Sequence, residues 1–400
     1  MSRRATTDGP PRLDVDAMLD DPSLRVVVCC GSGGVGKTTV AAALALRGAE
    51  RGRRTVVLTI DPARRLAQSL GLSELDNTPR PVEGVVAGAG GSLDAMMLDM
   101  KRTFDEVVQT HATPEKAAQM LANPFYQALS SSFAGTQEYM AMEKLGQLRA
   151  VQDADGRDRW DLIVVDTPPS RSALDFLDAP ERLGSFLDSR FLRLLLTPAK
   201  AGGKAYARVL STIAGGVTGV MTKVLGAQVL TDVQTFVAAF DSMFGGFRER
   251  AQRTYALLAG KGTRFVVVAA PEPDAVREAG FFVDRLLADR MPLGGVVVNR
   301  ATLTPVPDLG SDETRAAAER ADTEGGHRAG TAEVLWVHAR RAARVEAESE
   351  VVSRLVRVDP PVPTVVVPAR PLDVTDLDAL RAVGDDLASG PVVTPRAGDR

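Results

Sequence analysis

Short, nearly continuous runs of hydrophobic residues recur along this chain, with longer stretches of helical character between them. Runs of this kind, rich in valine, are typical of strands that are buried on both faces of a parallel sheet. The connections between such strands are right-handed and usually helical. The pattern therefore predicts an α/β fold with a mainly parallel sheet flanked by helices. The runs are 26–30, 55–60, 162–165, 265–269, 295–298 and 364–367.

Two intervals between the predicted strands, 93–151 and 180–259, are too long for simple crossovers and have helical character. We expect them to be insertions that together form a helical subdomain, and insertions often carry the specialised function of a fold. In the second interval, Phe and Met residues recur at helical spacing. They could pack the core of this subdomain, or they could line an adaptable groove for an apolar ligand or helix.

Two other ranges differ from the rest in composition. Residues 1–22 are polar and lack the apolar segment of a signal peptide, which predicts a disordered leader. Residues 302–333 are rich in Asp, Glu, Ala and Gly, which predicts a mobile surface segment. We expect the remaining chain, 23–400, to form a single domain that includes the insertions. No run is long and apolar enough to span a bilayer.

The net charge and the cysteine content limit the kinds of partner and metal site that we expect. The 400 residues carry a formal net charge of −3, with a pI near 5.8, so nucleic acid is not favoured as a partner. The only cysteines, Cys29 and Cys30, are adjacent and lie in a predicted strand, which excludes a C-x-x-C metal site and favours a core role in a reducing cytoplasm. The three histidines are scattered and suggest no metal cluster.

A G-x-x-x-x-G-K-T motif lies between the first hydrophobic run and the helix-forming run 39–49. This order of strand, Gly-rich turn and helix is typical of a P-loop, whose backbone N–H groups and helix N-terminus bind nucleotide phosphates. In that interpretation Lys37 reaches the β- and γ-phosphates and Thr38 binds Mg²⁺. The alternative is a Gly-rich loop that only joins two elements. The predicted binding residues are Gly31, Ser32, Gly33, Gly34, Val35, Gly36, Lys37, Thr38 and Thr39.

Two aspartates follow predicted strands, at the edge of the sheet where α/β proteins bind ligands. Asp166 follows the run 162–165 and is the candidate for the carboxylate that supports Mg²⁺ beside a P-loop. Asp61 follows the run 55–60. The alternatives are a helix cap or turn residue for Asp166 and a turn residue before proline for Asp61.

Several motifs occur in one order along most of the chain, at 33–39, 59–63, 166–170, 174–177, 270–272, 297–300 and 367–371. Together they resemble the P-loop, switch I, switch II and later strand ends of the ATPase family that contains the arsenite-pump (ArsA) and tail-anchored-protein-targeting ATPases. The resemblance implies a deviant Walker, nitrogenase iron protein-like P-loop fold with ATP and Mg²⁺ as cofactors. It also implies a dimer that opens and closes with nucleotide.

The same resemblance assigns roles to individual residues. Asp61 matches the switch I aspartate that orients the hydrolytic water, and Asn299 matches an asparagine that hydrogen-bonds adenine. Glu272 matches an acidic residue near the nucleotide. Taken alone, Asn299 could simply end a strand and Glu272 could belong to the first turn of a helix.

Three departures from the family pattern affect the functional interpretation. Ser32 stands where the family has a signature lysine that reaches the partner's nucleotide, and Arg171 and Ser172 stand where switch II has glycine and histidine. The thiols of an arsenite site or a zinc-clamped dimer are absent from the sequence. We therefore expect neither of those sites. We expect either slow hydrolysis by this chain alone or a dimer with a paralogous subunit that carries the lysine.

The leading functional hypothesis is a cytoplasmic ATPase that cycles between ATP-closed and ADP-open dimers and moves its helical insertions. Its load would be a membrane-protein segment, an apolar client or a membrane partner, with a peripheral position at the membrane. The alternatives are a positioning or regulatory ATPase of the ParA and MinD type, and a low-activity nucleotide-binding subunit of a heteromeric ATPase. A metabolic kinase or ligase is less favoured, because no acceptor pocket is evident in the sequence.

Overall fold

The computed structural model describes residues 11–61, 65–86, 90–124, 126–127, 130, 136–168, 246, 249–324, 329–356 and 361–391. The chain divides into two compact units. The first comprises Met1–Met97, Arg159–Ala173 and Leu258–Arg400, and the second comprises Leu98–Asp158 and Leu174–Leu257. Each unit is described by itself below.

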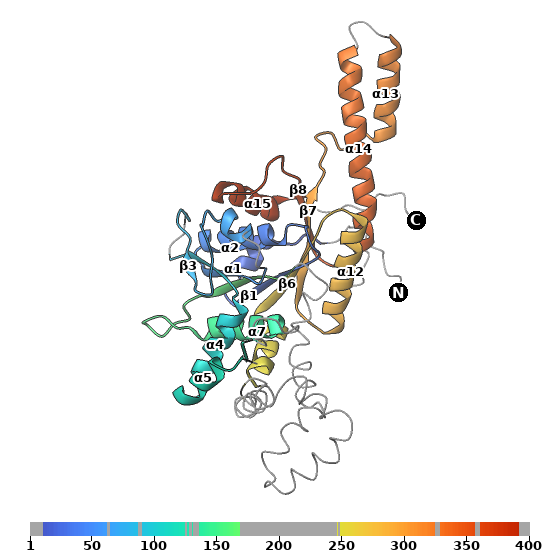
Figure 1. The fold of residues 1–400 in the computed structure, drawn as a ribbon. Helices are drawn as coiled ribbons and strands as arrows, with labels where there is room; N and C mark the ends of the chain where they lie inside the picture. Colours follow the sequence, from blue (N-terminus) through green and yellow to red (C-terminus); the bar gives the residue numbers. More distant parts are fainter. Residues whose placement is uncertain are drawn as a thin grey trace, which may run out of the picture. The chain divides into compact units, whose positions relative to one another are not determined.

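An eight-stranded sheet forms the centre of the first unit (Figure 1). Its strand order is β3-β4-β2-β5-β1-β6-β7-β8, in which β3 pairs antiparallel with β4 and the other pairs are parallel. The predicted α/β fold is therefore confirmed, and each of the predicted runs coincides with a strand to within a few residues. The strands are β1 (Val26–Cys30), β2 (Arg54–Thr59), β3 (Arg80–Pro81), β4 (Ser92–Met97), β5 (Leu162–Asp166), β6 (Thr263–Ala269), β7 (Leu293–Ala301) and β8 (Thr364–Pro368).

Two crossover helices lead away from the middle of the sheet in opposite directions. Helix α2 (Lys37–Glu50) connects β1 to β2, and α12 (Pro273–Ala288) connects β6 to β7. Crossovers between parallel strands are right-handed as a rule, so two helices that lead in opposite directions lie on opposite faces of the sheet. The connections reverse direction between the neighbouring strands β1 and β6, and such folds bind ligands at the carboxyl ends of the strands at this point.

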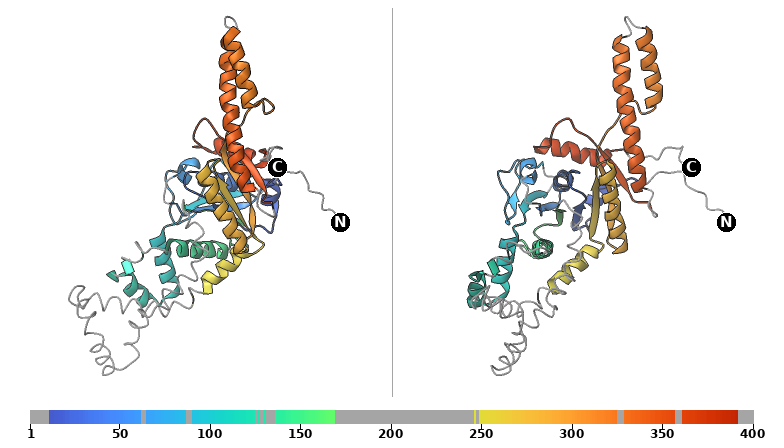
Figure 2. Two further views of the ribbon diagram at one scale, coloured as in Figure 1. Left: turned by 90° about the vertical axis from the view of Figure 1, so that its right-hand side faces the viewer. Right: turned by 45° about the vertical axis from the view of Figure 1, so that its right-hand side comes forward.

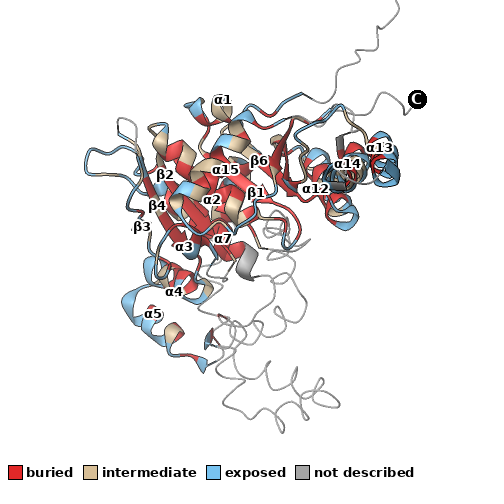
Figure 3. Cartoon of the chain, turned by 90° about the horizontal axis from the view of Figure 1, so that it is seen from above, coloured by how far each residue is buried: buried red, intermediate tan, exposed pale blue. Residues whose placement is uncertain are grey.

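Helix α2 lies against the sheet with ten of its residues buried (Figure 3). Half of them are alanines, which let the helix approach the strands and its neighbour α15 (Leu377–Ser389) closely. The short helices α1 (Val15–Asp20) and α3 (Arg65–Ser69) belong to the same layer. This packing fixes the start of α2, and therefore the loop that precedes it, against the end of β1.

The chain segment before β1 differs from the disordered leader expected for 1–22. Leu13 donates its backbone N–H to the carbonyl of Thr364 at 2.9 Å, and Asp14 caps α1 by accepting from the N–H of Ala17. Val15 and Leu19 are completely buried in the core of the first unit. These two side chains are too few to form a recognisable pattern in a polar sequence. Residues 1–10 lie outside the described part of the chain.

The first predicted insertion, 93–151, begins with a strand, where the sequence predicted helical character. Residues 92–97 form β4, which pairs in parallel with β2. Leu93 and Ala95 point into the core, while the polar Asp94 between them accepts a hydrogen bond from the indole N–H of Trp160 at 2.8 Å. The alternation is short and contains few hydrophobic residues, so it does not stand out from the helical sequence that follows.

The second unit contains α4 (Met100–His111), α5 (Pro114–Leu121) and α7 (Thr136–Ala150). Charged side chains join its elements: Lys144 on α7 binds Glu106 on α4 at 2.8 Å, and Glu143 binds Arg250 at 3.0 Å. The Phe and Met residues of 186–244 that suggested an apolar groove lie outside the described residues.

Helices α13 (Ser311–Glu324) and α14 (Ala329–Val356) pack side by side as an antiparallel hairpin (Figure 2). All of α13 and the start of α14 fall within 302–333, where we expected a mobile surface segment. Alanine has a high helix propensity, and Thr314, Ala318 and Ala321 form a buried stripe along α13. Within the described part of the chain, no helix has both the length and the apolar composition needed to cross a membrane.

Candidate functional site

The Gly-rich loop between β1 and α2 depends on glycine at its last position. Gly36 precedes α2 with φ +88°, in the left-handed region. A Cβ at this position would lie only 2.3 Å from the amide nitrogen of Asn299. The loop therefore approaches β7 as closely as a bare backbone allows. The N-terminus of α2, with its partial positive charge, begins at the next residue.

Lys37 is buried at the base of this loop, with only 6% of its surface exposed. Its ammonium group donates to the carbonyl of Ser32 at 2.7 Å, so the side chain curls back along the loop. Burial lowers the pKa of Lys37, and the nearby Asp166 opposes this shift. A buried cation at a helix N-terminus, within a loop of backbone N–H groups, is suited to bind an anion such as phosphate.

Asp166 lies at the end of β5, between the ends of β1 and β2, and is completely buried. The hydroxyl of Thr59 donates to its Oδ2 at 2.8 Å, and the Thr38 hydroxyl is a second hydrogen-bond partner. Burial raises the pKa of Asp166 to about 6, although both hydroxyls and Lys37 act in the opposite direction. The carboxylate is therefore held beside the loop at a cost in desolvation.

The residues at this position fit a magnesium ion. Thr38 and Asp166 supply the hard oxygen ligands that Mg²⁺ prefers. Oδ1 of Asp166 is buried and has no hydrogen-bond partner among the described residues. A buried carboxylate oxygen without a partner is rare in folded proteins, and a cation with its bound water would satisfy it.

The raised pKa of Asp166 predicts a pH-dependent stability without added nucleotide or metal. Because the folded protein binds this proton more tightly than the unfolded chain does, Asp166 should lose its stabilising effect as the pH rises from about 4 to about 6. We expect the free energy of unfolding to fall over this range by about 1–3 kcal/mol relative to an Asp166→Asn variant. Thermal unfolding of both proteins between pH 4.5 and 7 measures this difference. Parallel pH profiles would contradict it.

Asp61 lies half-buried just after β2, at the same edge of the sheet. Its backbone N–H donates to the hydroxyl of Thr59 at 3.2 Å, and this hydroxyl also contacts Asp166. Thr59 thus connects the two aspartates, although the sequence did not single it out. Only its position two residues before Asp61 could have indicated this role of Thr59. Arg171 and Ser172 lie outside the described residues.

Two further predicted residues, Thr39 and Glu272, lie at the starts of helices. Thr39 lies half-buried in the first turn of α2. Glu272 is exposed and precedes α12, which begins with Pro273. The pKa of Arg344, on α14, is raised by its hydrogen bond to Glu348 and, to a smaller extent, by the charge of Glu272.

The end of β7 contacts the loop directly. Asn299 is buried, and its amide nitrogen donates to the carbonyl of Val35 at 2.8 Å. The guanidinium of Arg300 donates to the carbonyl of Gly34 at 3.0 Å. Arg300 was not among the predicted site residues. Only its position next to Asn299 could have indicated it, because the contact joins residues that are far apart in the sequence.

Three other residues from the sequence analysis are buried. Ser32, which stands in place of the signature lysine, is only 7% exposed. Cys29 and Cys30 are completely buried free thiols, as expected for core residues. Burial raises the pKa of Cys30 to about 12, which keeps this thiol protonated and unreactive.

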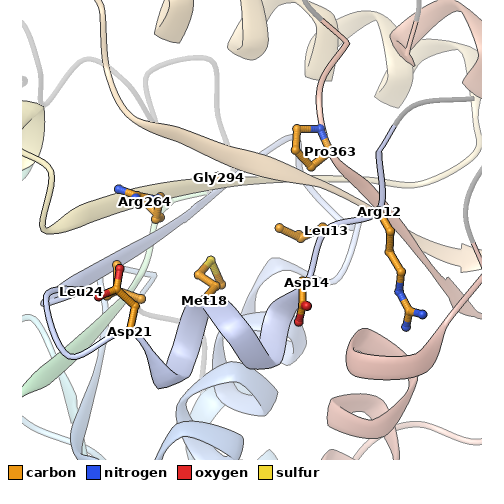
Figure 4. A pocket seen from close by; sticks show the side chains of 9 residues that line it. All are labelled: Arg12, Leu13, Asp14, Met18, Asp21, Leu24, Arg264, Gly294 and Pro363. Carbon is orange, nitrogen blue, oxygen red and sulfur yellow. The ribbon is translucent and has the colours of Figure 1, made fainter. Parts of the chain in front are cut away.

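A separate cavity of about 230 Å³ lies at the opposite edge of the sheet (Figure 4). Its lining residues lie before or at the beginnings of β1, β6, β7 and β8, whereas the Gly-rich loop follows the end of β1. Arg264, on its wall, donates to the carbonyls of Lys261 and Thr263 at 2.8 Å. The cavity is therefore not part of the loop site. It is lined by Arg12, Leu13, Asp14, Met18, Asp21, Leu24, Arg264, Gly294 and Pro363.

The parallel sheet, the loop after β1 and the carboxylate at the end of β5 define a P-loop NTPase fold. The chain belongs to the anion-transporting ATPase family, whose sequence model matches residues 24–321. This confirms the resemblance that the motifs indicated.

Three relatives illustrate the similarity. The chain is 34% identical over 195 residues to an uncharacterized protein of Streptomyces coelicolor, 27% over 239 residues to the ATPase GET3 of Malassezia globosa, and 28% over 287 residues to the ATPase ARSA2 of Chlamydomonas reinhardtii. These alignments cover 48%, 59% and 71% of this chain. They cover 45%, 66% and 69% of the respective relatives, so the first relative is matched over less than half of its length.

Proposed function

We propose that this chain binds Mg-ATP at the P-loop and hydrolyses it to ADP and phosphate. The observation that carries the proposal is the arrangement of Lys37, Thr38 and Asp166: a buried cation and a buried carboxylate with an unpartnered oxygen, both beside the N-terminus of α2. Membership of the anion-transporting ATPase family supports the same activity.

In this proposal each residue has a defined part. The N–H groups of the loop and Lys37 bind the β- and γ-phosphates, while Thr38 and Asp166 hold Mg²⁺. The metal neutralises the negative charge of the phosphates and the charge that develops during phosphoryl transfer. Lys37 leaves the Ser32 carbonyl and reaches the phosphates when nucleotide is bound. Asp61 orients the water that attacks the γ-phosphate, which its place beside Thr59 and Asp166 supports.

The role of Asp61 can be tested by Asp61→Asn, which keeps the size of the side chain and removes its charge. We expect turnover of Mg-ATP to fall by about 10²–10⁴-fold, because water positioning and proton transfer contribute effects of that size. ATP affinity should change by less than about fivefold, since Asp61 does not belong to the phosphate loop. Asp312→Asn is the control, because Asp312 is exposed on α13. Full turnover by Asp61→Asn would exclude this role.

We further propose that ATP drives the opening and closing of a dimer in the cytoplasm, at or near a membrane. The closing dimer would move the helices of the second unit and act on a membrane-protein segment, an apolar client or a membrane partner. Two observations support this part: the family of the chain and the Phe- and Met-rich sequence of 180–259. Recording the oligomer mass with and without ATP tests the dimer cycle.

A second candidate function is a nucleotide-binding subunit with little turnover of its own. Ser32 favours it, because this residue is buried and offers no cation for a partner's nucleotide. In this case the chain would pair with a paralogous subunit that carries the lysine. Tight ATP binding without turnover, followed by activity when such a subunit is added, would distinguish it from a self-sufficient ATPase.

A further inference from the structure

Arg300 occupies a backbone position that normally favours glycine. Its φ is +62°, in the left-handed region that a side chain makes unfavourable. The pairing of β7 with β8 shifts register between Asn299 and Ala301, so Arg300 is the extra residue of a β-bulge. Glycine is the usual left-handed residue of a β-bulge, and bulges are common beside active sites, where they redirect a side chain. The backbone of Arg300 is therefore strained, and strain of this kind points to a function of the side chain.

The side chain of Arg300 reaches the phosphate loop. Its Nη1 donates to the carbonyl of Gly34 at 3.0 Å, next to the bond from Asn299 to the carbonyl of Val35 at 2.8 Å. Consecutive residues at the end of one strand thus hold consecutive carbonyls of the loop. Arg300 is exposed and Asn299 is buried, so removing the arginine side chain would leave no cavity in the core.

Peptide geometry connects these bonds to phosphate binding. A trans peptide is planar, and its C=O and N–H groups point in opposite directions. Holding the Gly34 carbonyl therefore fixes the direction of the N–H of Val35. Holding the Val35 carbonyl likewise fixes the N–H of Gly36. Because both carbonyls are drawn toward β7, the two N–H groups face away from this strand, and such aligned N–H groups form the anion-binding surface of a phosphate loop.

We propose that Arg300 is a positioning residue that preorganises the P-loop for the β-phosphate of a nucleoside di- or triphosphate, by holding the Gly34 carbonyl from the end of β7. This inference rests on the proposed function of the loop as a nucleotide site. It explains why a strained arginine stands where glycine would be easier to accommodate. It also gives β7 two adjacent contacts to the loop, one buried and one exposed.

The chain provides a matched control for the backbone effect. Arg290 is the other residue besides glycine with positive φ among the described residues, at +56°. It is exposed, follows the end of α12 and precedes β7, whereas Arg300 lies near the other end of that strand. Glycine is favoured at both positions for the same backbone reason. A change to glycine therefore relieves the same strain in each, but only Arg300→Gly removes a contact to the P-loop.

The test measures Mg-ADP affinity by calorimetry, together with the unfolding temperature of the nucleotide-free protein, for wild type, Arg300→Gly, Arg300→Lys and Arg290→Gly. We expect Arg300→Gly to bind Mg-ADP about tenfold more weakly without a lower unfolding temperature, because a charged hydrogen bond is lost while strain is relieved. Arg300→Lys keeps a cationic donor and should recover part of the affinity. Arg290→Gly should bind Mg-ADP as wild type does.

Three outcomes would overturn the proposal. The first is an affinity of Arg300→Gly within about twofold of wild type. The second is an equal loss of affinity in Arg290→Gly, which would indicate a general backbone effect. The third is a fall of the unfolding temperature together with affinity in Arg300→Gly, which would mean that the arginine stabilises the fold. Absence of Mg-ADP binding by the wild type would instead contradict the proposed function, so the two failures can be told apart.

Discussion

Replacing Lys37 by methionine is expected to abolish measurable ATP turnover and to weaken Mg-ATP binding by about 10²–10³-fold, the size of the effect that one preorganised hydrogen-bond donor has on catalysis. Lys37 is buried beside the phosphate loop, where its charge has lost its hydration. A bound phosphate therefore gains a strong interaction with it. Methionine has a similar length and fills the same space, so the loop should keep its shape. Turnover assays and a calorimetric titration with Mg-ATP measure the two effects.

Lys37→Met should leave the nucleotide-free protein about as stable as wild type. Among the described residues, its ammonium group hydrogen-bonds only the carbonyl of Ser32, so replacing it also removes a desolvation cost. The thermal stabilisation that Mg-ATP gives to the wild type should disappear in the variant. Lys101→Met, at an exposed position on α4 where the lysine binds Asp105, is the control and should behave as wild type. Turnover by Lys37→Met within tenfold of wild type would contradict the assigned role.

Replacing Gly36 by alanine is expected to have the largest effect on stability, about 2–5 kcal/mol in the free energy of unfolding. Two costs add. The backbone is in the left-handed region at φ +88°, and the new Cβ would meet the amide nitrogen of Asn299 at 2.3 Å. Asn299 would have to move, which breaks its bond to the Val35 carbonyl and leaves buried polar groups unpaired. Mg-ATP binding should be lost as well, because the loop and the start of α2 shift together.

Gly34→Ala is the matched control for this prediction. Gly34 also has positive φ, at +79°, but a Cβ there would meet no atom within 4 Å. Only the backbone strain applies, so we expect a loss of about 1–2 kcal/mol. Adding Asn299→Ala to Gly36→Ala should recover part of the lost stability, since it removes the side chain that clashes. Equal destabilisation by the two alanine substitutions would show that the contact with Asn299 is unimportant.

The main strands and the phosphate loop could be predicted because their signals are local. Strands β1, β2, β5, β6, β7 and β8 are continuous hydrophobic runs, as expected for strands covered on both faces. The P-loop motif has a fixed spacing that follows from its backbone geometry. Asp61 and Asp166 could be placed at one edge of the sheet because the carboxyl ends of parallel strands lie together.

The elements that escaped prediction depend on distant partners. Strand β4 contains Asp94, which is accommodated because Trp160 binds it from another part of the chain. Helix α1 is too short to be stable alone and is held by burial of Val15 and Leu19. Arg300 contacts a residue 266 positions away, and sequence spacing gives no indication of that bond. Such contacts are set by the tertiary structure, so local patterns cannot reveal them.

Every functional role proposed above depends on binding of Mg-ATP by the loop after β1. The most direct test is calorimetric titration of Mg-ATP into Asp61→Asn, a variant chosen so that hydrolysis does not interfere. We predict one bound nucleotide per chain, affinity that falls when Mg²⁺ is removed with EDTA, and loss of binding when Lys37→Met is added. Absence of binding at millimolar Mg-ATP, or binding that persists unchanged in the Lys37→Met protein, would contradict the claim.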